Sequence, residues 1–389
     1  EVVEEPVGMP SDVFYVPLCA DSKSKDKISL EPVSEANTVY ENGAVWVGRA
    51  TLNLFSGKII APDTTYGVYK GWETVGISNN NPRKQLLSSV VSVSASTTYN
   101  ISVIYKSSND LIDDIYLRFN DSGWPESTYY IQPFVHGNDI KIENLGGGFK
   151  KCSANFTTKG TTTTIEQFFF DNDVAGTIIF LGNPQLEQRN FTTPYIENSR
   201  GVTDLEYNLY ESIGLDWNGS WSIVYWKKPV GTHTDNLTGY NIESLGCNSN
   251  SVGGGYRWWG KDNSYDRFSV SGTALSTFLP SDYFNEWQMV SIVKNGSTVT
   301  WKFWTRAGVI SHSETWGTIT SNYFVTQYGY DLKLGGWDNS NVCNTYFRGL
   351  FVVKEALSDS ELEAIHKTHA RVYENKLQIQ GCLKEKMSL

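Results

Sequence analysis

Short β-prone segments separated by turn residues fill residues 52–198, and their spacing limits the folds open to the chain. The segment 99–105 (YNISVIY) alternates apolar and polar residues with a period of two, which is typical of a half-buried strand. Gly, Asn, Asp or Pro stands between most of the segments, at the spacing found in sandwiches and jelly rolls. No helical period extends over this stretch. We therefore predict one β-sandwich, at residues 51–199.

A second group of strands follows the first. Residues 221–226 (WSIVYW) are apolar on both faces and predict a central strand that ends at residues 227–229 (KKP). Residues 287–304 predict a hairpin, because the pair Asn295-Gly296 tolerates the positive φ angles of a type I′ turn. These strands predict a second sandwich, at residues 200–372.

One short helix is predicted near the C-terminal end of the second sandwich. Ser358 is a good N-cap, and Glu361 stands where a capping box needs a carboxylate. Leu357 and Leu362 have the spacing of a hydrophobic staple. A single capped helix after so many strands indicates an element that closes a β-sandwich.

Composition and charge narrow the classes of function. The formal net charge is −10 and no basic run occurs, so we do not expect nucleic acid as a partner. No apolar run is long enough to span a bilayer, so we expect no membrane insertion. The chain begins at Glu1 rather than Met, and we expect a processed end or an excised piece there. The cysteines are far apart and form no CxxC pair, so we expect free thiols rather than disulfides or a metal site: Cys19, Cys152, Cys247, Cys343 and Cys382.

The acidic residues lack the pattern of a glycoside hydrolase. Such an enzyme needs two carboxylates that flank the scissile bond, about 5–9 Å apart. The nearest groups are Asp113-Asp114 and the pair Asp204 and Glu206, and neither has a further carboxylate in register. His366 and His369 have a spacing that zinc could use, but histidines at a helix C-terminus more often interact with the last carbonyls. We therefore expect no enzyme and no cofactor.

Aromatic and polar residues gather in residues 253–268 (GGGYRWWGKDNSYDRF), as a glycan site requires. Because neighbouring strand residues lie on opposite faces, Trp258 and Trp259 cannot both be core residues of a regular strand. The outer tryptophan either stacks on a sugar or packs against the other sandwich or a sister subunit. The candidate glycan-binding residues are Tyr256, Arg257, Trp258, Trp259, Asp262, Asn263, Tyr265 and Arg267, with Trp72, Trp124 and Tyr129 as a second cluster in the first sandwich.

Residues 178–196 (IIFLGNPQLEQRNFTTPYI) resemble the closing segment of carbohydrate-binding-module-like sandwiches in bacteriophage tail and fibre proteins. That family pattern is a strand, then Gln-Leu-Glu, a short loop, and a Thr-x-Tyr-Ile ending. Residues 51–54 (TLNL) resemble the entry of the same kind of sandwich. The residues that match the closing pattern are Gln185, Leu186, Glu187, Tyr195 and Ile196.

Residues 202–369 resemble a LamG-like, concanavalin-type jelly roll. The resemblance lies in WSIVYWKKP, EWQMVSIVKNGSTVTWKFW and YFRGLFVVKEALSDSELEAI. In such phage proteins this sandwich often starts before an inserted carbohydrate-binding-like domain, and VFYVPL followed by AVWVGRATLNL resembles that start. We therefore expect residues 11–50 to pair with the second sandwich, with residues 1–10 as an arm and 373–389 as a tail.

The same resemblance implies a calcium option, because LamG-like domains often hold a calcium ion with carboxylates and carbonyls. The oxygen-rich loop 337–341 (WDNSN) offers Asp338, Asn339 and Asn341 as ligands. The competing explanation is that turn geometry requires Asn and Asp at these positions.

These observations predict an all-β protein of two β-sandwich (jelly-roll) domains with one short C-terminal capped helix. The resemblance implies a bacteriophage virion structural protein, namely a fibre, tail or capsid-appendage component for display or adhesion. The expected partners are other virion proteins and a host-surface or environmental glycan, and the expected assembly is a homotrimer. Two alternatives stay open: a carbohydrate-binding accessory module of a secreted bacterial enzyme or adhesin, and a glycan depolymerase.

Overall fold

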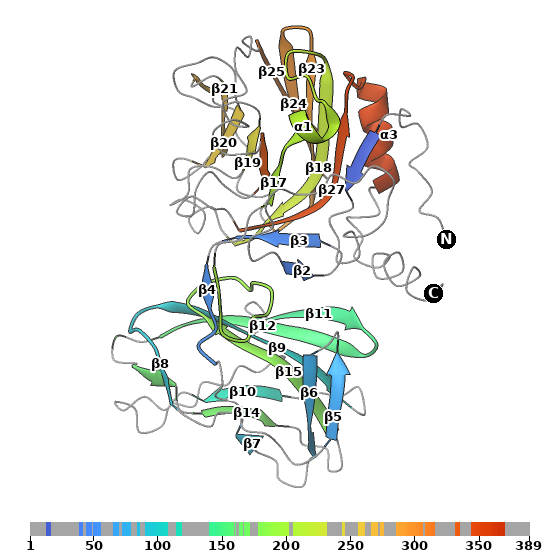
Figure 1. Cartoon of the computed structure of the whole chain (residues 1–389). Coiled ribbons are helices and arrows are strands. Elements are labelled where there is room, and N and C mark those ends of the chain that lie inside the picture. The colour runs from blue at the N-terminus through green and yellow to red at the C-terminus, as the bar shows by residue number, and fades with distance from the viewer. Residues whose placement is uncertain are drawn as a thin grey trace. The chain divides into compact units, whose positions relative to one another are not determined.

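The computed structural model divides the chain into two compact all-β units (Figure 1). Unit 1 comprises Glu1–Ala50 and Gly201–Leu389, and unit 2 comprises Thr51–Arg200, so unit 2 is an insertion in the sequence of unit 1. The structure describes residues 13–16, 39–41, 44–48, 50–55, 65–69, 72–78, 84–85, 90–107, 114–118, 140–158, 160, 163–165, 167–171, 178–201, 205–231, 243–245, 256–260, 266–270, 273–275, 285–305, 308–315, 331–334 and 344–369.

Two antiparallel sheets build unit 1. The larger sheet has the strand order β2-β3-β27-β18-β23-β24-β25, and β1 also pairs with β27. Its strands are β1 (Val13–Val16), β2 (Val39–Glu41), β3 (Ala44–Val47), β18 (Trp221–Pro229), β23 (Gln288–Asn295), β24 (Thr298–Thr305), β25 (Gly308–Thr315) and β27 (Thr345–Val353). The smaller sheet contains β17 (Leu205–Tyr207), β26 (Leu332–Leu334), β19 (Glu243–Leu245), β20 (Tyr256–Gly260), β21 (Asp266–Val270) and β22 (Thr273–Leu275), in that order.

Residues 11–50 contribute strands to the larger sheet of unit 1. Strand β1 pairs with β27 from Val13 opposite Val353, and β3 pairs with the other end of β27, where Trp46 lies opposite Tyr346. The early and late parts of the chain therefore share one sheet. The arm at 1–10 and the tail at 373–389 lie outside the described residues.

Strand β18 is central, as its apolar pattern predicts, but it is longer than expected. It pairs with β23 on one side and β27 on the other. The prediction that residues 227–229 end the strand is wrong, because β18 continues through Lys227 and Lys228 to Pro229. Lys227 is fully buried, with its Nζ atom 5.7 Å from the centre of the Phe303 ring. Packing of the lysine stem and its ammonium against this ring keeps a charged residue in the strand.

The hairpin of β23 and β24 is present, but its turn differs from the predicted one. Asn295 lies opposite Thr298, so the two turn residues are Gly296 and Ser297. Gly296 has a φ of 58°, while Asn295 and Ser297 have no positive φ. Glycine at the first turn position alone is typical of a type II′ rather than a type I′ turn. Lys294 fixes the turn by donating to the Gly296 carbonyl over 2.7 Å.

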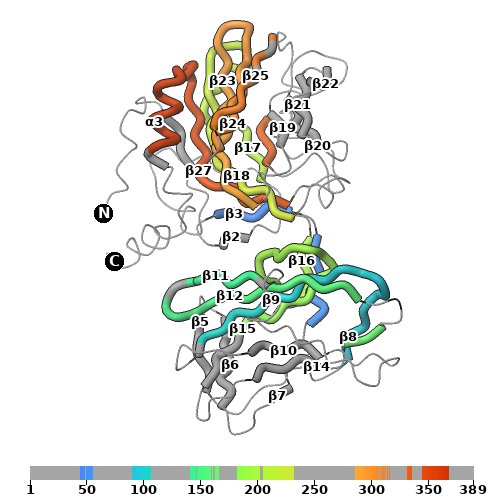
Figure 2. Tube along the Cα trace, turned by 180° about the vertical axis from the view of Figure 1, so that it is seen from behind, coloured from blue at the N-terminus to red at the C-terminus, as the bar shows by residue number. Residues whose placement is uncertain are grey.

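Helix α3 (Asp359–His369) is capped as the sequence predicts. The Ser358 N–H donates to Glu361 Oε2 over 2.7 Å, and the Glu361 N–H donates to Ser358 Oγ over 3.4 Å. Leu357 and Leu362 are buried and pack with Ile365 against Trp226 and other residues of β18, β23, β24 and β27. Figure 2 shows α3 beside β27, so the helix closes the outer face of this sheet.

A second short helix, α1 (Leu209–Ile213), corrects the expectation of a single helix. Asn208 Oδ1 accepts from the Glu211 N–H over 2.9 Å, and Asn208 Nδ2 donates to the Glu211 carboxylate over 2.8 Å. Gly214 ends the helix with a φ of 64°. Asn-x-x-Glu followed by glycine is therefore the sequence signal for this helix.

Unit 2 contains a six-stranded antiparallel sheet and smaller sheets. The order in the large sheet is β11-β12-β9-β15-β6-β5, made of β5 (Thr65–Tyr69), β6 (Trp72–Ser78), β9 (Thr98–Ser107), β11 (Ile140–Gly146), β12 (Phe149–Thr157) and β15 (Ile178–Glu187). The small sheets are formed by β10 (Asp114–Arg118), β14 (Gln167–Asp171) and β7 (Lys84–Gln85), by β13 (Thr164–Ile165) and β8 (Val91–Ser92), and by β16 (Ser199–Arg200) and β4 (Thr51–Leu52).

One face of the large sheet forms the apolar core of unit 2. Tyr99, Ile101 and Val103 of β9 pack there with Cys152 and Ala154 of β12. The opposite face carries cross-strand polar residues: Asn100 and Ser102 of β9, Asn155 and Ser153 of β12, and Glu187 and Gln185 of β15. Since side chains alternate along a strand, the same three strands build both the core and the polar surface that holds the cluster described below.

Candidate functional site

The predicted glycan residues of unit 1 fall on a pair of adjacent strands and the segment between them. Strands β20 and β21 pair without interruption from Tyr256 opposite Val270 to Gly260 opposite Asp266. This register places Trp259 opposite Arg267, so two of the predicted residues are cross-strand neighbours. Tyr256, Arg257 and Trp258 belong to β20, whereas Asp262, Asn263 and Tyr265 lie outside the described residues.

The second predicted glycan cluster and the calcium loop are described only in small part. Trp72 is the first residue of β6, and Trp124 and Tyr129 lie outside the described residues. Asp338, Asn339 and Asn341 also lie outside them, so the calcium option stays a prediction.

His366, considered above as a zinc ligand, lies against an aromatic ring. Its imidazole is 5.3 Å from the centre of the Trp304 ring, and burial lowers its pKa. Within the described part of the chain, no group of three or more His, Cys, Asp and Glu residues is placed to hold a metal ion.

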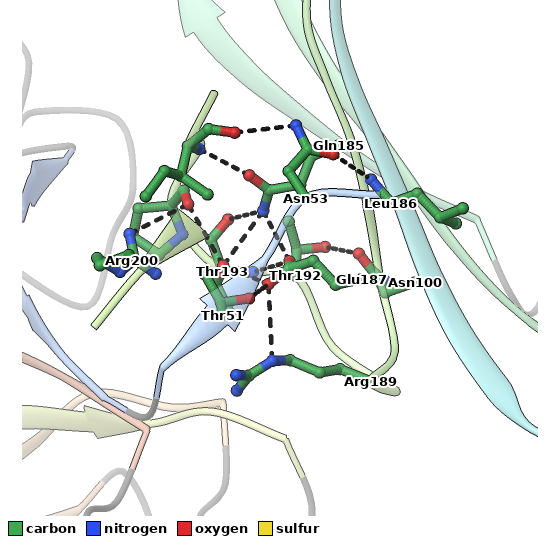
Figure 3. A network of polar contacts seen from close by, with 12 residues as sticks. Thr51, Asn53, Asn100, Gln185, Leu186, Glu187, Arg189, Thr192, Thr193 and Arg200 are labelled. Carbon is green, nitrogen blue, oxygen red and sulfur yellow. Dashed lines mark hydrogen bonds and ion pairs between the residues drawn. The ribbon is translucent and has the colours of Figure 1, made fainter. Parts of the chain in front are cut away.

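Among the residues that the structure describes, the most densely connected polar cluster lies in unit 2 and is centred on Glu187 (Figure 3). Glu187 and Gln185 are at the end of β15, and Thr193 follows in the closing segment. Each of these three side chains is 1% exposed or less. The Gln-Leu-Glu pattern therefore belongs to the strand itself rather than following it, and its two polar residues share the polar face of the sheet.

Four donors satisfy the Glu187 carboxylate. Oε1 accepts from the hydroxyls of Thr51 and of Thr193, the latter over 2.7 Å. Oε2 accepts from Gln185 Nε2 over 2.7 Å and from the Thr193 N–H over 3.2 Å. Arg189 adds a positive charge, with its Nε 3.6 Å from Oε1. Because charged acceptors make the stronger hydrogen bonds, a carboxylate in this position holds β4, β15 and the closing segment together.

Gln185 and Asn53 extend the cluster through backbone groups. Gln185 Oε1 accepts from the Ile196 N–H over 2.8 Å. Asn53 Nδ2 donates to the carbonyls of Pro184 and Ile196, and Asn53 Oδ1 accepts from the Leu186 N–H over 3.1 Å. The Asn53 side chain is thus hydrogen-bonded both to strand β15 and to the closing segment that ends unit 2.

The two ends of unit 2 also meet through their backbones. Arg200 lies opposite Thr51 in the β16–β4 pair, and the Asn53 N–H donates to the Asn198 carbonyl over 2.8 Å. Together with the side chains above, these bonds define a clamp formed by Thr51, Asn53, Gln185, Glu187 and Thr193.

A second buried carboxylate, Asp331, organises the start of unit 1 after the insertion. It accepts from the N–H groups of Leu209 and Tyr210, at 2.6 and 2.8 Å, and from Trp217 Nε1 at 2.8 Å. Burial raises the pKa of Asp331 to about 6, and the three donors oppose that rise. Its bonds explain how α1 and the following loop are fixed to β26.

Comparisons with known proteins give little that bears on function. No protein-family model matches the chain, and no curated protein matches it. The binding domain of botulinum neurotoxin serotype D/C aligns with 43% of the chain at 14% identity, with a TM-score of 0.30. Tailspike protein 2 of an Escherichia coli O157:H7 bacteriophage aligns with 47% of it at 14% identity, with a TM-score of 0.28. The alignments span 40% and 24% of those two structures. Likenesses this low carry no argument about activity or ligand.

In the described residues, no helix is both long enough and apolar enough to cross a membrane.

The clamp was only partly visible in the sequence. Its residues resemble a family ending, but their shared role depends on Thr51 and Thr193, which are far apart in the chain. The available signal was the presence of Gln and Glu at positions two apart on either side of Leu186, near the end of a strand that begins with four apolar residues.

Proposed function

We propose that the protein is a bacteriophage virion structural component that displays its sandwich units and adheres to host-surface or environmental glycans. The resemblance of residues 178–196 and 202–369 to phage tail and fibre sandwiches motivates this proposal. The observation that carries the adhesive part is the register of β20 and β21, which makes Trp259 and Arg267 direct neighbours. Ligand sites combine aromatic side chains with a few polar groups, and a neighbouring tryptophan and arginine supply one of each.

A glycan array with the full chain tests the adhesive role. We expect binding to a subset of glycans, and we expect either Trp258→Ala or Trp259→Ala to abolish it while the unfolding curve stays that of the wild type. The two variants are matched controls, because neighbouring strand positions lie on opposite faces. A wild type that binds no glycan, or two variants with unchanged profiles, would overturn the proposal.

A structural rather than catalytic role fits the described carboxylates. Glu187 is held in the clamp, Asp331 caps α1, and Glu206 pairs with Lys333 over 2.7 Å. We propose that the chain has no glycosidase activity. Release of new reducing ends from a bound glycan would contradict this and favour the depolymerase alternative.

We further propose a homotrimer, the assembly that the resemblance to phage fibres implies. Native mass spectrometry should then give a mass three times that of the chain. A stable monomer over the full range of working concentrations would contradict the assembly without affecting the glycan test.

A further inference from the structure

The strand register of the smaller sheet of unit 1 distinguishes its two faces. Directly opposite residues of paired strands share a face, and successive residues of one strand alternate between faces. Tyr207 and Leu332 are opposite each other and are 1% and 0% exposed, so their face is the core face. Glu243 and Asp266 belong to it only as the first residues of their strands. Its apolar positions farther across the sheet are Leu245, Tyr256, Val270, Trp258, Phe268 and Leu275.

The opposite face of this sheet is mostly polar. One row of paired positions crosses all six strands through Glu206, Lys333, Ser244, Arg257, Ser269 and Ala274. Trp259 and Arg267 are the next pair along β20 and β21 on the same face. We call these eight positions the arginine face. The register therefore assigns Trp259 to the arginine face and Trp258 to the core face.

The arginine face is basic although the chain as a whole is acidic. Its eight positions hold three cationic residues and one carboxylate, so their formal charge is +2, whereas that of the whole chain is −10. The carboxylate, Glu206, is paired with Lys333 over 2.7 Å, which leaves the two arginines as the excess. Because salt screens exposed charges beyond about 8–10 Å, this local excess governs a ligand held against the face.

The pairing pattern places Trp259 close to both arginines. Directly opposite residues have Cβ atoms about 5 Å apart, which applies to Trp259 and Arg267. Arg257 is two positions from Trp259 on β20, about 7 Å along the strand. Arg257 and Arg267 are diagonal neighbours, a relation that corresponds to about 7–8 Å. One aromatic position and two cationic positions thus form a compact triangle on one face.

We propose that the arginine face binds a carboxylated glycan, with Trp259 against the sugar ring and Arg257 and Arg267 at the carboxylate. A guanidinium can donate two parallel hydrogen bonds to a carboxylate, a group that neutral sugars lack. The C–H face of a sugar ring offers the apolar surface that an indole buries. This inference rests on the adhesive function proposed above and names its ligand class, which is an acidic sugar.

Single-stranded nucleic acid is the competing ligand, because it also combines anionic groups with flat rings. Its binding sites are basic grooves that follow the backbone over several nucleotides and stack successive bases. The arginine face has one aromatic position and an excess of two cations. These groups fit one acidic sugar better than a run of phosphates and bases.

Paired ligands test the inference on the full chain. An array presents oligosaccharides of uronic and nonulosonic acids, each beside its methyl ester, which keeps the sugar and removes the charge. We expect the acids to bind at least about tenfold more tightly than the esters, because the esters lose hydrogen bonds to a charged group. The preference should decrease as the salt concentration rises.

Matched variants locate the site. Arg257→Gln and Arg267→Gln should each weaken binding of the acids about tenfold or more and leave the esters unchanged. Trp259→Ala should weaken binding of acids and esters alike. Lys367→Gln removes the same charge from an exposed position of α3 and should change neither.

The outcomes distinguish this inference from the proposed function. Equal binding of acids and esters, or arginine variants with wild-type affinity for the acids, would overturn the carboxylate site and leave adhesion standing. Binding of single-stranded DNA or of sulfated glycans in place of the carboxylated ones would overturn it too. A chain that binds no glycan would overturn both. The wild-type comparison of acid and ester decides the question even where a variant fails to fold.

Discussion

Gly349 and Gly296 have similar positive φ angles but different surroundings. Gly349 has a φ of 52°, and a Cβ there would lie 3.4 Å from Trp226 Cε3. Gly296 has a φ of 58°, and a Cβ there would meet nothing within 4 Å. Gly349 stands at the register shift between β18 and β27, so it allows both the bulge and the close approach of the indole.

Alanine at these two glycines should therefore have unequal effects. Gly296→Ala should lower the free energy of unfolding by about 1 kcal/mol, the cost of the left-handed backbone alone. Gly349→Ala should cost about 2–3 kcal/mol, because the added Cβ would also crowd the buried Trp226 at the near limit of contact. Urea unfolding measures both, with Ser297→Ala as a control that should change little. Equal losses at the two glycines would contradict the role of Trp226.

Asp331 should make stability depend on pH. Its pKa is about 6 in the folded chain and 3.8 ordinarily, so the folded state holds the proton more tightly. The stabilisation from protonation is complete below the ordinary pKa and is lost as pH rises through about 6. The difference in unfolding free energy between wild type and Asp331→Asn should thus fall by up to about 3 kcal/mol from pH 4 to pH 7. Parallel pH profiles of the two proteins would show that Asp331 does not titrate in this range.

At the scale of elements, helix α3 could be predicted because its capping residues, Ser358 and Glu361, are only three positions apart in the sequence. Removing the Ser358 hydroxyl should therefore loosen the first turn of this helix. Ser358→Ala should destabilise unit 1 by about 1 kcal/mol and speed amide exchange at the start of α3. Hydrogen exchange with mass spectrometry measures this, and Glu363→Gln, on the exposed face, should leave the first turn protected. Unchanged exchange in Ser358→Ala would contradict the capping role.

The elements that the sequence misplaced depend on distant contacts. Strand β18 passes through Lys227 because Phe303 of β24 lies beside the lysine ammonium, and no local pattern records that contact. The turn after β23 shifts by one residue because its register follows the pairing with β24 and the bond from Lys294 to Gly296. Helix α1 needed Asp331, which is far away in the chain, as well as its own Asn208 cap. The all-β class itself was predictable, because strand periodicity and turn residues are local.

The candidate glycan site could be predicted only as a group of residue types. The register of β20 and β21 brings Trp259 and Arg267 together, whereas the sequence showed only that both lie in one stretch rich in aromatic and polar residues. The clamp could be found only in part in this way, because Thr51 becomes a neighbour of Glu187 only when both ends of unit 2 meet.

At the scale of the whole molecule, unit 2 is an insertion whose two ends are adjacent. Thr51 and Arg200 are β-partners, so their Cα atoms are about 5 Å apart. Unit 1 retains both sheets and α3 when residues 51–200 are removed. Each unit therefore has its own core, which is the property expected of separate domains.

Excision of unit 2 tests this architecture most directly. A chain in which a short Gly-Ser linker joins Ala50 to Gly201 removes the insertion without stretching its ends, because those ends were neighbours in the β16–β4 pair. Thermal unfolding of this chain should show one cooperative transition with a strand-rich circular dichroism spectrum. An excised chain without a cooperative transition would contradict the account of two self-contained sandwiches.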